Sequence, residues 1–359
     1  MLPIRILIVD DSPSIRRQLG ELLESDPEIV VAGMASTGLL ALERIAELKP
    51  DLITLDAEIP GMHGVTTLVE IHKRFPALPV IMFSPATGPG ARATVEALAR
   101  GASDYAAEPF QAGSLEIARE RVCQELVPKI KALGAAHRQL PKPSGLPTQV
   151  FPVSGGTLTR IDVVAIGSST GGPNALAELM PNFSVGFPVP ILIVQHMPAM
   201  FTALLSERLN SLTPLHVRLG VDGQILEPGQ VWIAPGDQHM TVVHRGDDRV
   251  LRLSQDPPEN SCRPAVDALF RSLAQSCGAN VLAVVLTGMG SDGTKGAAEI
   301  RKVGGTVIVQ DEVSSVVWGM PGSVVTAGLA NRVCSLNAIA GEILRRTALW
   351  RNGAKASHV

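Results

Sequence analysis

Three apolar, strand-like segments in the second half of the chain each end at a polar residue of a catalytic type. Segment 161–166 precedes GSSTGG at 167–172, segment 190–194 precedes Gln195 and His196, and segment 281–286 precedes TGMGSDG at 287–293. The carboxyl ends of the strands in a doubly wound parallel sheet form one edge, where ligands bind. We therefore expect Ser169, His196 and Asp292 to meet at that edge. These are the residue types that nucleophilic acyl transfer requires.

Ser169 is the centre of a G-x-S-x-G motif, the sharp strand-to-helix turn that exposes a nucleophile. The flanking glycines permit such a turn, and a helix beginning near Pro173 would direct its positive end at a developing oxyanion. The order serine, histidine, aspartate differs from the orders in α/β-hydrolases, chymotrypsin and subtilisin, which argues against those folds. The alternative interpretation is a Gly/Ser-rich turn that only caps a helix.

The loop that contains Asp292 also fits a second class of site. Residues 288–293 have the pattern G-x-G-x-x-G, precede a helix-like stretch at 294–303, and are followed by Asp311 after the next strand, as in dinucleotide-binding folds. In that case the Asp292 carboxylate would face a pyrophosphate, and Ser169 and His196 would have no role. A simpler interpretation is that His196 is a core histidine. Against this, the apolar run before it is short and Pro198 follows it, so the ring should lie at the edge of the sheet. Despite these objections, dinucleotide binding is the alternative to hydrolysis.

Composition limits the function classes. The 359 residues predict two domains, and a net charge of -3 with 3% aromatic residues argues against nucleic-acid binding. No apolar run reaches the length of a membrane span, and the first apolar run, 4–9, is too short for a signal peptide. The cysteines are scattered without metal-binding spacing, which is typical of reduced thiols in a cytoplasmic protein. They are Cys123, Cys262, Cys277 and Cys334.

The first half of the chain has a repeating β/α plan. Apolar runs at 4–9, 29–31, 51–55, 79–83 and 102–107 alternate with helix-patterned segments such as 14–24 and 38–48. This alternation predicts a parallel, doubly wound α/β domain. Asp10 and Asp11 follow the first run and Asp56 follows the third, so their carboxylates should converge at one edge. Hard oxygen ligands of this kind suit Mg²⁺.

A composition change separates the halves. Residues 129–139 are basic, and 140–148 (LPKPSGLPT) are rich in proline and glycine, as linkers are. The sequence therefore predicts a first domain at 1–122, a linker at 123–158, a mostly parallel α/β domain at 159–349 and a tail at 350–359.

Together the halves resemble the chemotaxis response-regulator protein-glutamate methylesterases. The first 122 residues are similar to a two-component receiver, and 162–346 are similar to the methylesterase domain through TGMGSDG and three further stretches, 233–240, 263–267 and 319–321. The resemblance implies that Ser169 is the nucleophile, His196 the base and Asp292 the carboxylate that orients the base. It also implies that the backbone N–H of Met289 contributes to the oxyanion site.

For the receiver, the resemblance implies that Asp56 accepts the phosphoryl group and that Asp10, Asp11 and Asp56 hold Mg²⁺. Ser84 would bond the phosphoryl group and Tyr105 would be the aromatic switch residue. Glu108 stands where receivers carry a lysine. That lysine would pair with phosphoryl oxygens, whereas a glutamate repels them.

The function implied is a cytoplasmic, receiver-gated serine hydrolase. It would release methanol from glutamate methyl esters on chemoreceptor cytoplasmic helices, deamidate receptor glutamines at the same site, and receive phosphoryl groups from a chemotaxis histidine kinase. We expect no cofactor in the esterase site, no nucleic-acid partner and no membrane insertion. The alternatives are a receiver-controlled dinucleotide-binding module and a non-catalytic signalling scaffold. Reaction of Ser169 with a fluorophosphonate would separate the hydrolase from both.

Overall fold

The computed structural model describes residues 2–85, 88–109, 115–138 and 160–356. The chain forms two compact units, Met1–Lys142 and Pro143–Val359. Within the described residues, no helix combines the length and the apolarity needed to cross a bilayer.

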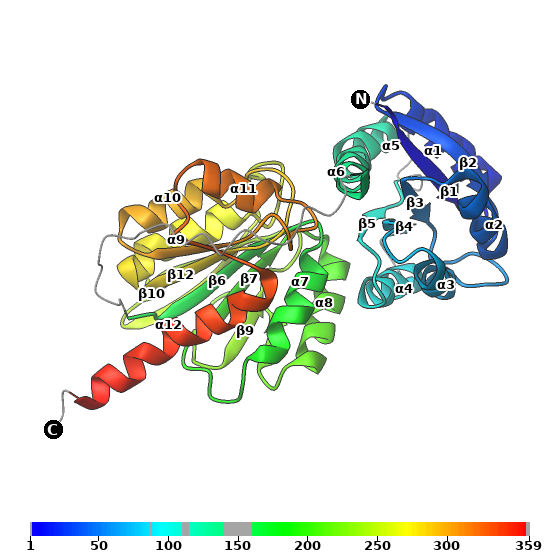
Figure 1. Cartoon of the computed structure of the whole chain (residues 1–359). Coiled ribbons are helices and arrows are strands. Elements are labelled where there is room, and N and C mark those ends of the chain that lie inside the picture. Colours follow the sequence, from blue (N-terminus) through cyan, green and yellow to red (C-terminus); the bar gives the residue numbers. More distant parts are fainter. Residues whose placement is uncertain (1, 86–87, 110–114, 139–159, 357–359) are drawn as a thin grey trace. The chain divides into compact units, whose positions relative to one another are not determined.

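The first unit is a five-stranded parallel sheet with helices on both faces. Its strand order is β2-β1-β3-β4-β5, and every neighbouring pair is parallel. Figure 1 shows α1, α5 and α6 on one side of this sheet and α2, α3 and α4 on the other. Its elements are β1 (Ile4–Val9), α1 (Pro13–Glu24), β2 (Ile29–Ala35), α2 (Gly38–Leu48), β3 (Leu52–Leu55), α3 (Gly64–Arg74), β4 (Val80–Ser84), α4 (Gly88–Ala99), β5 (Asp104–Ala107), α5 (Leu115–Arg121), the π-helical η1 (Val122–Leu126) and α6 (Val127–Arg138).

Local sequence signals explain where these elements begin. Helix α1 has Pro13 in its first turn, and the Ser12 hydroxyl accepts a hydrogen bond from the N–H of Ile15. Its apolar side buries Leu19 and Leu23 against the sheet. Each strand run expected from the sequence in this half is present, with shifts of a few residues at the ends.

Helix α6 packs against the first unit. Lys131 pairs with Asp26 at 2.8 Å and Glu28 at 2.7 Å, and Ile130 is buried in the core of this unit. The sequence assigned 123–158 to the linker, but 123–138 are helical because α6 has a buried apolar side and cations that meet the acids of the first unit. The Pro-rich segment 140–148 lies outside the described residues.

The second unit has a seven-stranded parallel sheet of order β14-β13-β12-β6-β7-β9-β8 and an antiparallel hairpin, β10-β11. Its elements are β6 (Val163–Ser168), α7 (Gly172–Leu179), the 3-10 helix η2 (Met180–Asn182), β7 (Ile191–Gln195), α8 (Ala199–Leu212), β8 (His216–Leu219), β9 (Gln230–Ile233), β10 (His239–Arg245), β11 (Asp248–Ser254), α9 (Val266–Cys277), the 3-10 helix η3 (Gly278–Asn280), β12 (Val281–Val285), α10 (Thr294–Lys302), β13 (Thr306–Gln310), α11 (Gly319–Thr326), β14 (Arg332–Cys334) and α12 (Leu336–Ala356).

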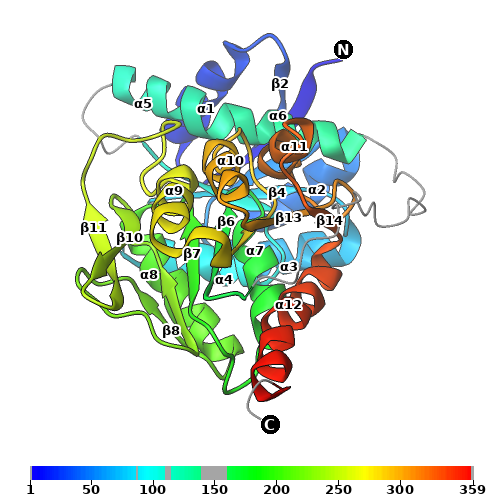
Figure 2. The same ribbon diagram turned by 90° about the vertical axis from the view of Figure 1, so that its left-hand side faces the viewer.

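Helices cover both faces of this sheet. Helices α9, α10 and α11 lie on one face and α7, α8 and α12 on the other (Figure 1), and the view in Figure 2 shows α9 and α10 side by side. Strands β6, β7 and β12 are buried along their whole length, as expected for parallel strands covered on both faces. The fold class expected from the sequence, two doubly wound, mostly parallel α/β units, is confirmed.

The strand order places a topological switch point between β6 and β12. From β6 the chain continues on one side, to β7, then to the edge strand β8 and back to β9, whereas from β12 it continues in the other direction through β13 and β14. Ligand sites of doubly wound sheets lie beyond the carboxyl ends of the strands at such a point. The loops after β6, β7 and β12 therefore surround the expected site.

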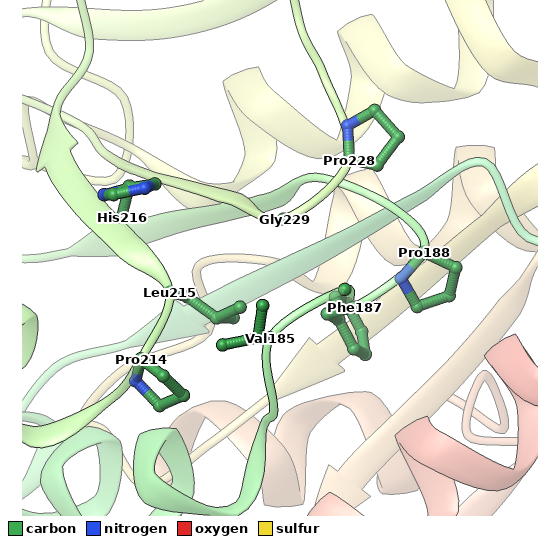
Figure 3. Close-up of a pocket in the computed structure, with 9 residues that line it drawn as sticks. Val185, Phe187, Pro188, Pro214, Leu215, His216, Pro228 and Gly229 are labelled. Atoms are coloured by element: carbon green, nitrogen blue, oxygen red, sulfur yellow. The ribbon is translucent and has the colours of Figure 1, made fainter.

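A surface hollow of about 440 Å³ lies at the opposite edge of the same sheet (Figure 3). Its mostly apolar lining comes from segments that precede β7, β8 and β9, at the amino ends of these strands. The hollow is therefore separate from the loops that carry the predicted triad. Its lining residues include Val185, Phe187, Pro188, Pro214, Leu215, His216 and Pro228.

Candidate active site

Ser169 lies in a tight turn between β6 and α7. Its N–H donates to the carbonyl of Thr287 at 3.1 Å, and its own carbonyl accepts from the N–H of Gly172 at 2.8 Å. Gly171 adopts φ +77°, a conformation that favours glycine, immediately before α7. The turn expected from the G-x-S-x-G motif is therefore present.

Gln195, the last residue of β7, forms hydrogen bonds with both this turn and His196. Its side-chain Nε2 donates to the carbonyl of Ser169 at 2.9 Å and to the carbonyl of His196 at 3.3 Å. Its Oε1 accepts from the hydroxyl of Ser168 at 2.7 Å. Ser168 and Gln195 are partners in the sheet register and end β6 and β7, so Ser169 and His196 directly follow two adjacent strands. Nothing in the sequence marks Gln195 as a site residue, because the pairing of β6 with β7 appears only in the folded sheet.

His196 and Asp292 form a buried pair. Nε2 of His196 lies 2.7 Å from Oδ2 of Asp292, and the two side chains are 12% and 2% exposed. The carboxylate also accepts from the N–H groups of Val266 at 2.6 Å, Asp267 at 3.0 Å and Gly293 at 2.9 Å. Burial raises the pKa of Asp292, but the bonds to His196 and the backbone outweigh burial and lower the pKa below its usual value. Asp292 is therefore an ionised acceptor that fixes Nε2 as a donor.

The second ring nitrogen of His196 is the one left for proton transfer. In this structure Nδ1 lies 3.4 Å from Sγ of Cys262. Burial lowers the pKa of His196, but Asp292 and Cys262 together raise it to about 9. Ser169 makes no side-chain hydrogen bond to any described residue, so the serine and the base share a site without being bonded to each other.

The loop between Pro257 and Ala265 holds Asn260 and Cys262 beside this pair. Asn260 donates to Asp292 at 2.9 Å and to Asp267 at 3.0 Å. His239 contacts both ends of the loop, since its Nδ1 accepts a hydrogen bond from the N–H of Ala265 and its Nε2 lies 3.1 Å from the carbonyl of Pro257. Neither Asn260 nor Cys262 was singled out as a site residue from the sequence, because nothing in their spacing marks them.

The loop after β12 passes close to the serine at Gly288, the residue before Met289. A Cβ on Gly288 would lie 2.9 Å from the Cβ of Ser169, so only glycine fits there. Within the described part of the chain, the N–H of Met289 donates no hydrogen bond, which leaves it available to an oxyanion. The Asp292 carboxylate in this loop is hydrogen-bonded to His196. A carboxylate held in this position does not favour a pyrophosphate in the same place.

The acidic residues of the first unit also converge. Ligand oxygens of Asp10, Asp11 and Asp56 lie within 4.8 Å of one another. Burial and the neighbouring carboxylates Asp10 and Asp11 raise the pKa of Asp56 to about 6. Burial is also the largest cause of the raised pKa of Asp10. Mutual repulsion of this kind is relieved when a divalent cation binds.

Ser84 and Tyr105 lie on neighbouring strands of the same sheet. Ser84 closes β4, is 1% exposed, and its hydroxyl has no hydrogen-bond partner among the described residues. Tyr105 is 5% exposed, and Nζ of Lys129 from α6 lies 4.7 Å from its ring centroid. Burial holds the pKa of Tyr105 well above its usual range. The Tyr105 ring, on β5, is thus buried, with Lys129 of α6 over its face.

Glu108 follows β5 and belongs to the same acidic pocket. Its N–H donates to the carbonyl of Ser84 at 2.9 Å. Burial, followed by the carboxylates of Asp10, Asp56 and Asp11, raises the pKa of Glu108 to about 7. The pocket therefore holds four interacting acids, where the family resemblance implies three acids and a lysine.

Comparisons with known proteins agree with this architecture. A family model described as CheB methylesterase matches residues 164–343, and one described as response regulator receiver domain matches residues 6–119. The chain is 47% identical over 350 residues to a protein-glutamate methylesterase/protein-glutamine glutaminase of Trichodesmium erythraeum, covering 96% of this chain and 99% of that one. A protein of the same name from Nocardioides sp. is 47% identical over 354 residues, covering 97% and 96%.

A solved structure matches the second half. The crystal structure of the Thermotoga maritima CheB methylesterase catalytic domain has 42% sequence identity and a TM-score of 0.51, covering 52% of this chain and 99% of that one. The resemblance seen in the sequence motifs is confirmed. The chain belongs to the CheB methylesterase family, with a response-regulator receiver domain preceding the methylesterase domain.

Proposed function

We propose that this protein hydrolyses glutamate methyl esters on the cytoplasmic helices of chemoreceptors and deamidates receptor glutamines at the same site. The observation that carries the proposal is the His196–Asp292 pair, held beside the Ser169 turn at the switch point of the sheet. The names of the relatives, protein-glutamate methylesterase/protein-glutamine glutaminase, support the substrate class.

The geometry supports a two-step acyl transfer. The Ser169 oxygen attacks the ester carbonyl while Nδ1 of His196 takes the serine proton, and Asp292 stabilises the imidazolium through Nε2. The N–H of Met289 and the amino end of α7 stabilise the oxyanion. The same proton then passes from Nδ1 to the departing methoxide, which leaves as methanol. Water, deprotonated by His196, hydrolyses the acyl-enzyme and restores both Ser169 and the glutamate.

An amide substrate follows the same path. Glutamine gives a tetrahedral intermediate of the same shape, and Nδ1 of His196 would then protonate its amide nitrogen, so that the C–N bond breaks and the nitrogen leaves as ammonia. Amides are intrinsically less reactive than esters, so we expect deamidation to be the slower reaction at this site.

The acidic pocket is proposed as the phosphorylation site. Asp56 would accept the phosphoryl group, and Asp10, Asp11 and Asp56 would hold Mg²⁺, which supplies positive charge to the phosphoryl oxygens when bound. The buried, unpartnered hydroxyl of Ser84 fits a role as donor to the phosphoryl group. Glu108 opposes the same group, so we expect phosphorylation to change activity only weakly.

The proposed setting follows from this chemistry. The receiver, 1–122, would take phosphoryl groups from a chemotaxis histidine kinase in the cytoplasm, and the catalytic domain, 159–349, would act on receptor helices. A nucleic-acid partner is not expected at a net charge of -3.

Methanol release from methylated receptor membranes tests the hydrolase. The wild-type protein should release methanol, Ser169→Ala should release none above background, and Ser168→Ala should retain activity as the matched control. Methanol release by Ser169→Ala would overturn the assignment.

Acetyl phosphate tests the receiver. We expect a small increase in activity for the wild-type protein and a larger one for Glu108→Lys, because lysine restores a cation at the phosphoryl oxygens. A strong wild-type response that Glu108→Lys does not increase would show that the glutamate is tolerated.

A further inference from the structure

A cysteine side chain lies at the nitrogen of His196 that must accept the serine proton. Sγ of Cys262 is 3.4 Å from Nδ1, while Nε2 on the other side of the ring bonds Asp292 at 2.7 Å. A thiol, an imidazole and a carboxylate in this order are the groups that activate cysteine nucleophiles. Cys262 and the predicted nucleophile Ser169 therefore depend on the same base.

The loop that carries Cys262 is fixed with respect to this base. The backbones of Glu259 and Cys262 exchange hydrogen bonds at 2.8 and 3.1 Å, and Asn260 between them bonds Asp292 at 2.9 Å. The thiol is thus held at Nδ1 by the same carboxylate that orients the ring. Cys262 is half-buried, so part of the residue is open to solvent.

The other three cysteines have different surroundings. Burial raises the pKa of the Cys277 and Cys334 thiols, which keeps them protonated and unreactive. Cys123 is exposed on η1. In the described part of the chain, Cys262 is the only cysteine with a hydrogen bond to a histidine, and this bond contributes to the raised pKa of His196.

We propose that Cys262 is a second nucleophile of the His196–Asp292 pair, that it reacts with peroxides, and that its oxidation switches off hydrolysis. The thiol gives its proton to Nδ1 of His196, and the thiolate sulfur attacks one oxygen of the peroxide. The O–O bond breaks, and the departing oxygen takes the proton from Nδ1 and leaves as water or an alcohol. The product is a Cys262 sulfenic acid, with the sulfur oxidised by two electrons and the peroxide reduced by two.

The sulfenic acid blocks Nδ1 of His196, which the reduced thiol leaves accessible to Ser169. Before oxidation, the proton shared between Cys262 and Nδ1 returns to the sulfur, which leaves Nδ1 free to accept the proton of Ser169. The S–OH group adds an oxygen and a stronger donor at Nδ1, and it competes with the serine hydroxyl for the base. An external dithiol reverses the reaction by forming a mixed disulfide, with loss of water, and then resolving it.

Alkylation by iodoacetamide tests the activated thiol without an activity assay. In the intact protein at pH 7, we expect Cys262 to be modified roughly tenfold faster than Cys123, because Nδ1 of His196 lies beside the Cys262 thiol to take its proton, whereas Cys123 makes no hydrogen bond to a histidine in the described part of the chain. His196→Gln should bring the rate at Cys262 down to that of Cys123. Peptide mass spectrometry measures each site, and a near-native circular dichroism spectrum confirms that the variant is folded. Equal rates at the two cysteines of the wild-type protein would overturn the inference.

Peroxide treatment tests the consequence for hydrolysis, and this part rests on the proposed function. We expect millimolar hydrogen peroxide to lower wild-type ester hydrolysis by about tenfold or more, since a blocked general base costs roughly 10²–10⁴ in rate. Dithiothreitol should restore it, and dimedone should trap the sulfenic acid at Cys262. Ester hydrolysis by Cys123→Ser should remain sensitive to peroxide. Hydrolysis by Cys262→Ser should be the same before and after peroxide treatment.

The outcomes separate the two proposals. Fast labelling of Cys262 in a protein without esterase activity would refute the proposed hydrolysis and leave the activated thiol standing. Dimedone trapping at Cys262 with no loss of ester hydrolysis would show that the thiol does not share the base of Ser169, which refutes this inference alone.

Discussion

The side-chain amide of Gln195 donates to the carbonyl oxygen of Ser169 at 2.9 Å. The strand that precedes His196, the proposed base, thereby also fixes the turn that carries Ser169, the proposed nucleophile. Because Gln195 is 1% exposed and fully hydrogen-bonded, its bonds define the position of this turn. The two catalytic loops are thus held as one unit by a residue that does no chemistry.

Replacement of Gln195 by methionine should lower kcat by about 10²-fold with a smaller change in KM, because a displaced nucleophile loses alignment more than binding. Stability should fall by about 1–3 kcal/mol, since buried polar partners are left unpaired. Steady-state kinetics and chemical denaturation measure the two effects. Gln224→Met is the matched control, because Gln224 also bonds a backbone carbonyl, that of Ile225, but away from the triad. Unchanged kcat in Gln195→Met would contradict the assigned role.

The two adjacent serines should respond differently to substitution. Ser169→Ala should abolish hydrolysis and labelling by a fluorophosphonate, because triad members act as a unit. Ser168 is 0% exposed and its hydroxyl bonds Gln195, so Ser168→Ala removes a structural bond and should cost about tenfold or less in kcat. His196→Ala should resemble Ser169→Ala, and Asp292→Asn should be somewhat milder. Equal losses in the two serine variants would exclude Ser169 as the nucleophile.

Asn260 should control the pH dependence of hydrolysis. It donates to both Asp267 and Asp292, whose carboxylates lie in one buried cluster. Asn260→Asp replaces a donor with a third carboxylate, and the added negative charge favours protonated His196. The acidic limb of the kcat profile should therefore move to higher pH.

The control for this variant is Ser261→Gly. Ser261 has φ +61°, close to the φ +51° of Asn260, and is exposed as Asn260 is, but it makes no hydrogen bond to either carboxylate. Glycine tolerates this conformation, so only a backbone effect of the loop would appear. A shift of the same size in both variants would attribute the Asn260 effect to the loop backbone and not to charge.

The acidic pocket should make the first unit less stable as pH rises. The folded-state pKa values of Asp56 and Glu108 are raised to about 6 and about 7. For a raised carboxyl pKa, the stabilising contribution is complete below the unfolded-state value near pH 4 and is lost as pH rises through the folded value. Thermal unfolding without Mg²⁺ should therefore show a falling Tm for the first unit between pH 5 and pH 8.

Added Mg²⁺ should reverse this loss, because it pairs with the ionised carboxylates, and its affinity should rise over the same pH range. Calorimetry of the full chain with and without Mg²⁺ measures both effects. Glu108→Gln should flatten the pH dependence, while Glu116→Gln, at an exposed position on α5, should not. A Tm independent of pH between 5 and 8 would show that the carboxylates do not repel each other as the structure indicates.

The amino-acid sequence alone determined the two α/β units and the polar residues that follow their strands. The reason is local: apolar runs of strand length, glycines at the turns and helix-start signals such as Ser12-Pro13 act through near neighbours. The placement of Ser169, His196 and Asp292 at one edge then followed from the rule that parallel strands end on the same side. Acids at strand ends predicted the Asp10, Asp11 and Asp56 cluster in the same way.

Only the tertiary structure decided which groups contact the base. Gln195, Asn260 and Cys262 carry no sequence signal, because their roles depend on contacts between segments far apart in the chain, such as Cys262 with His196 across 66 residues. The packing of α6 against the first unit also depended on Lys131 meeting acids about 100 residues earlier in the sequence. Strand order and loop packing set these distances, and both arise from burial summed over the whole sheet, which no local pattern of residues encodes.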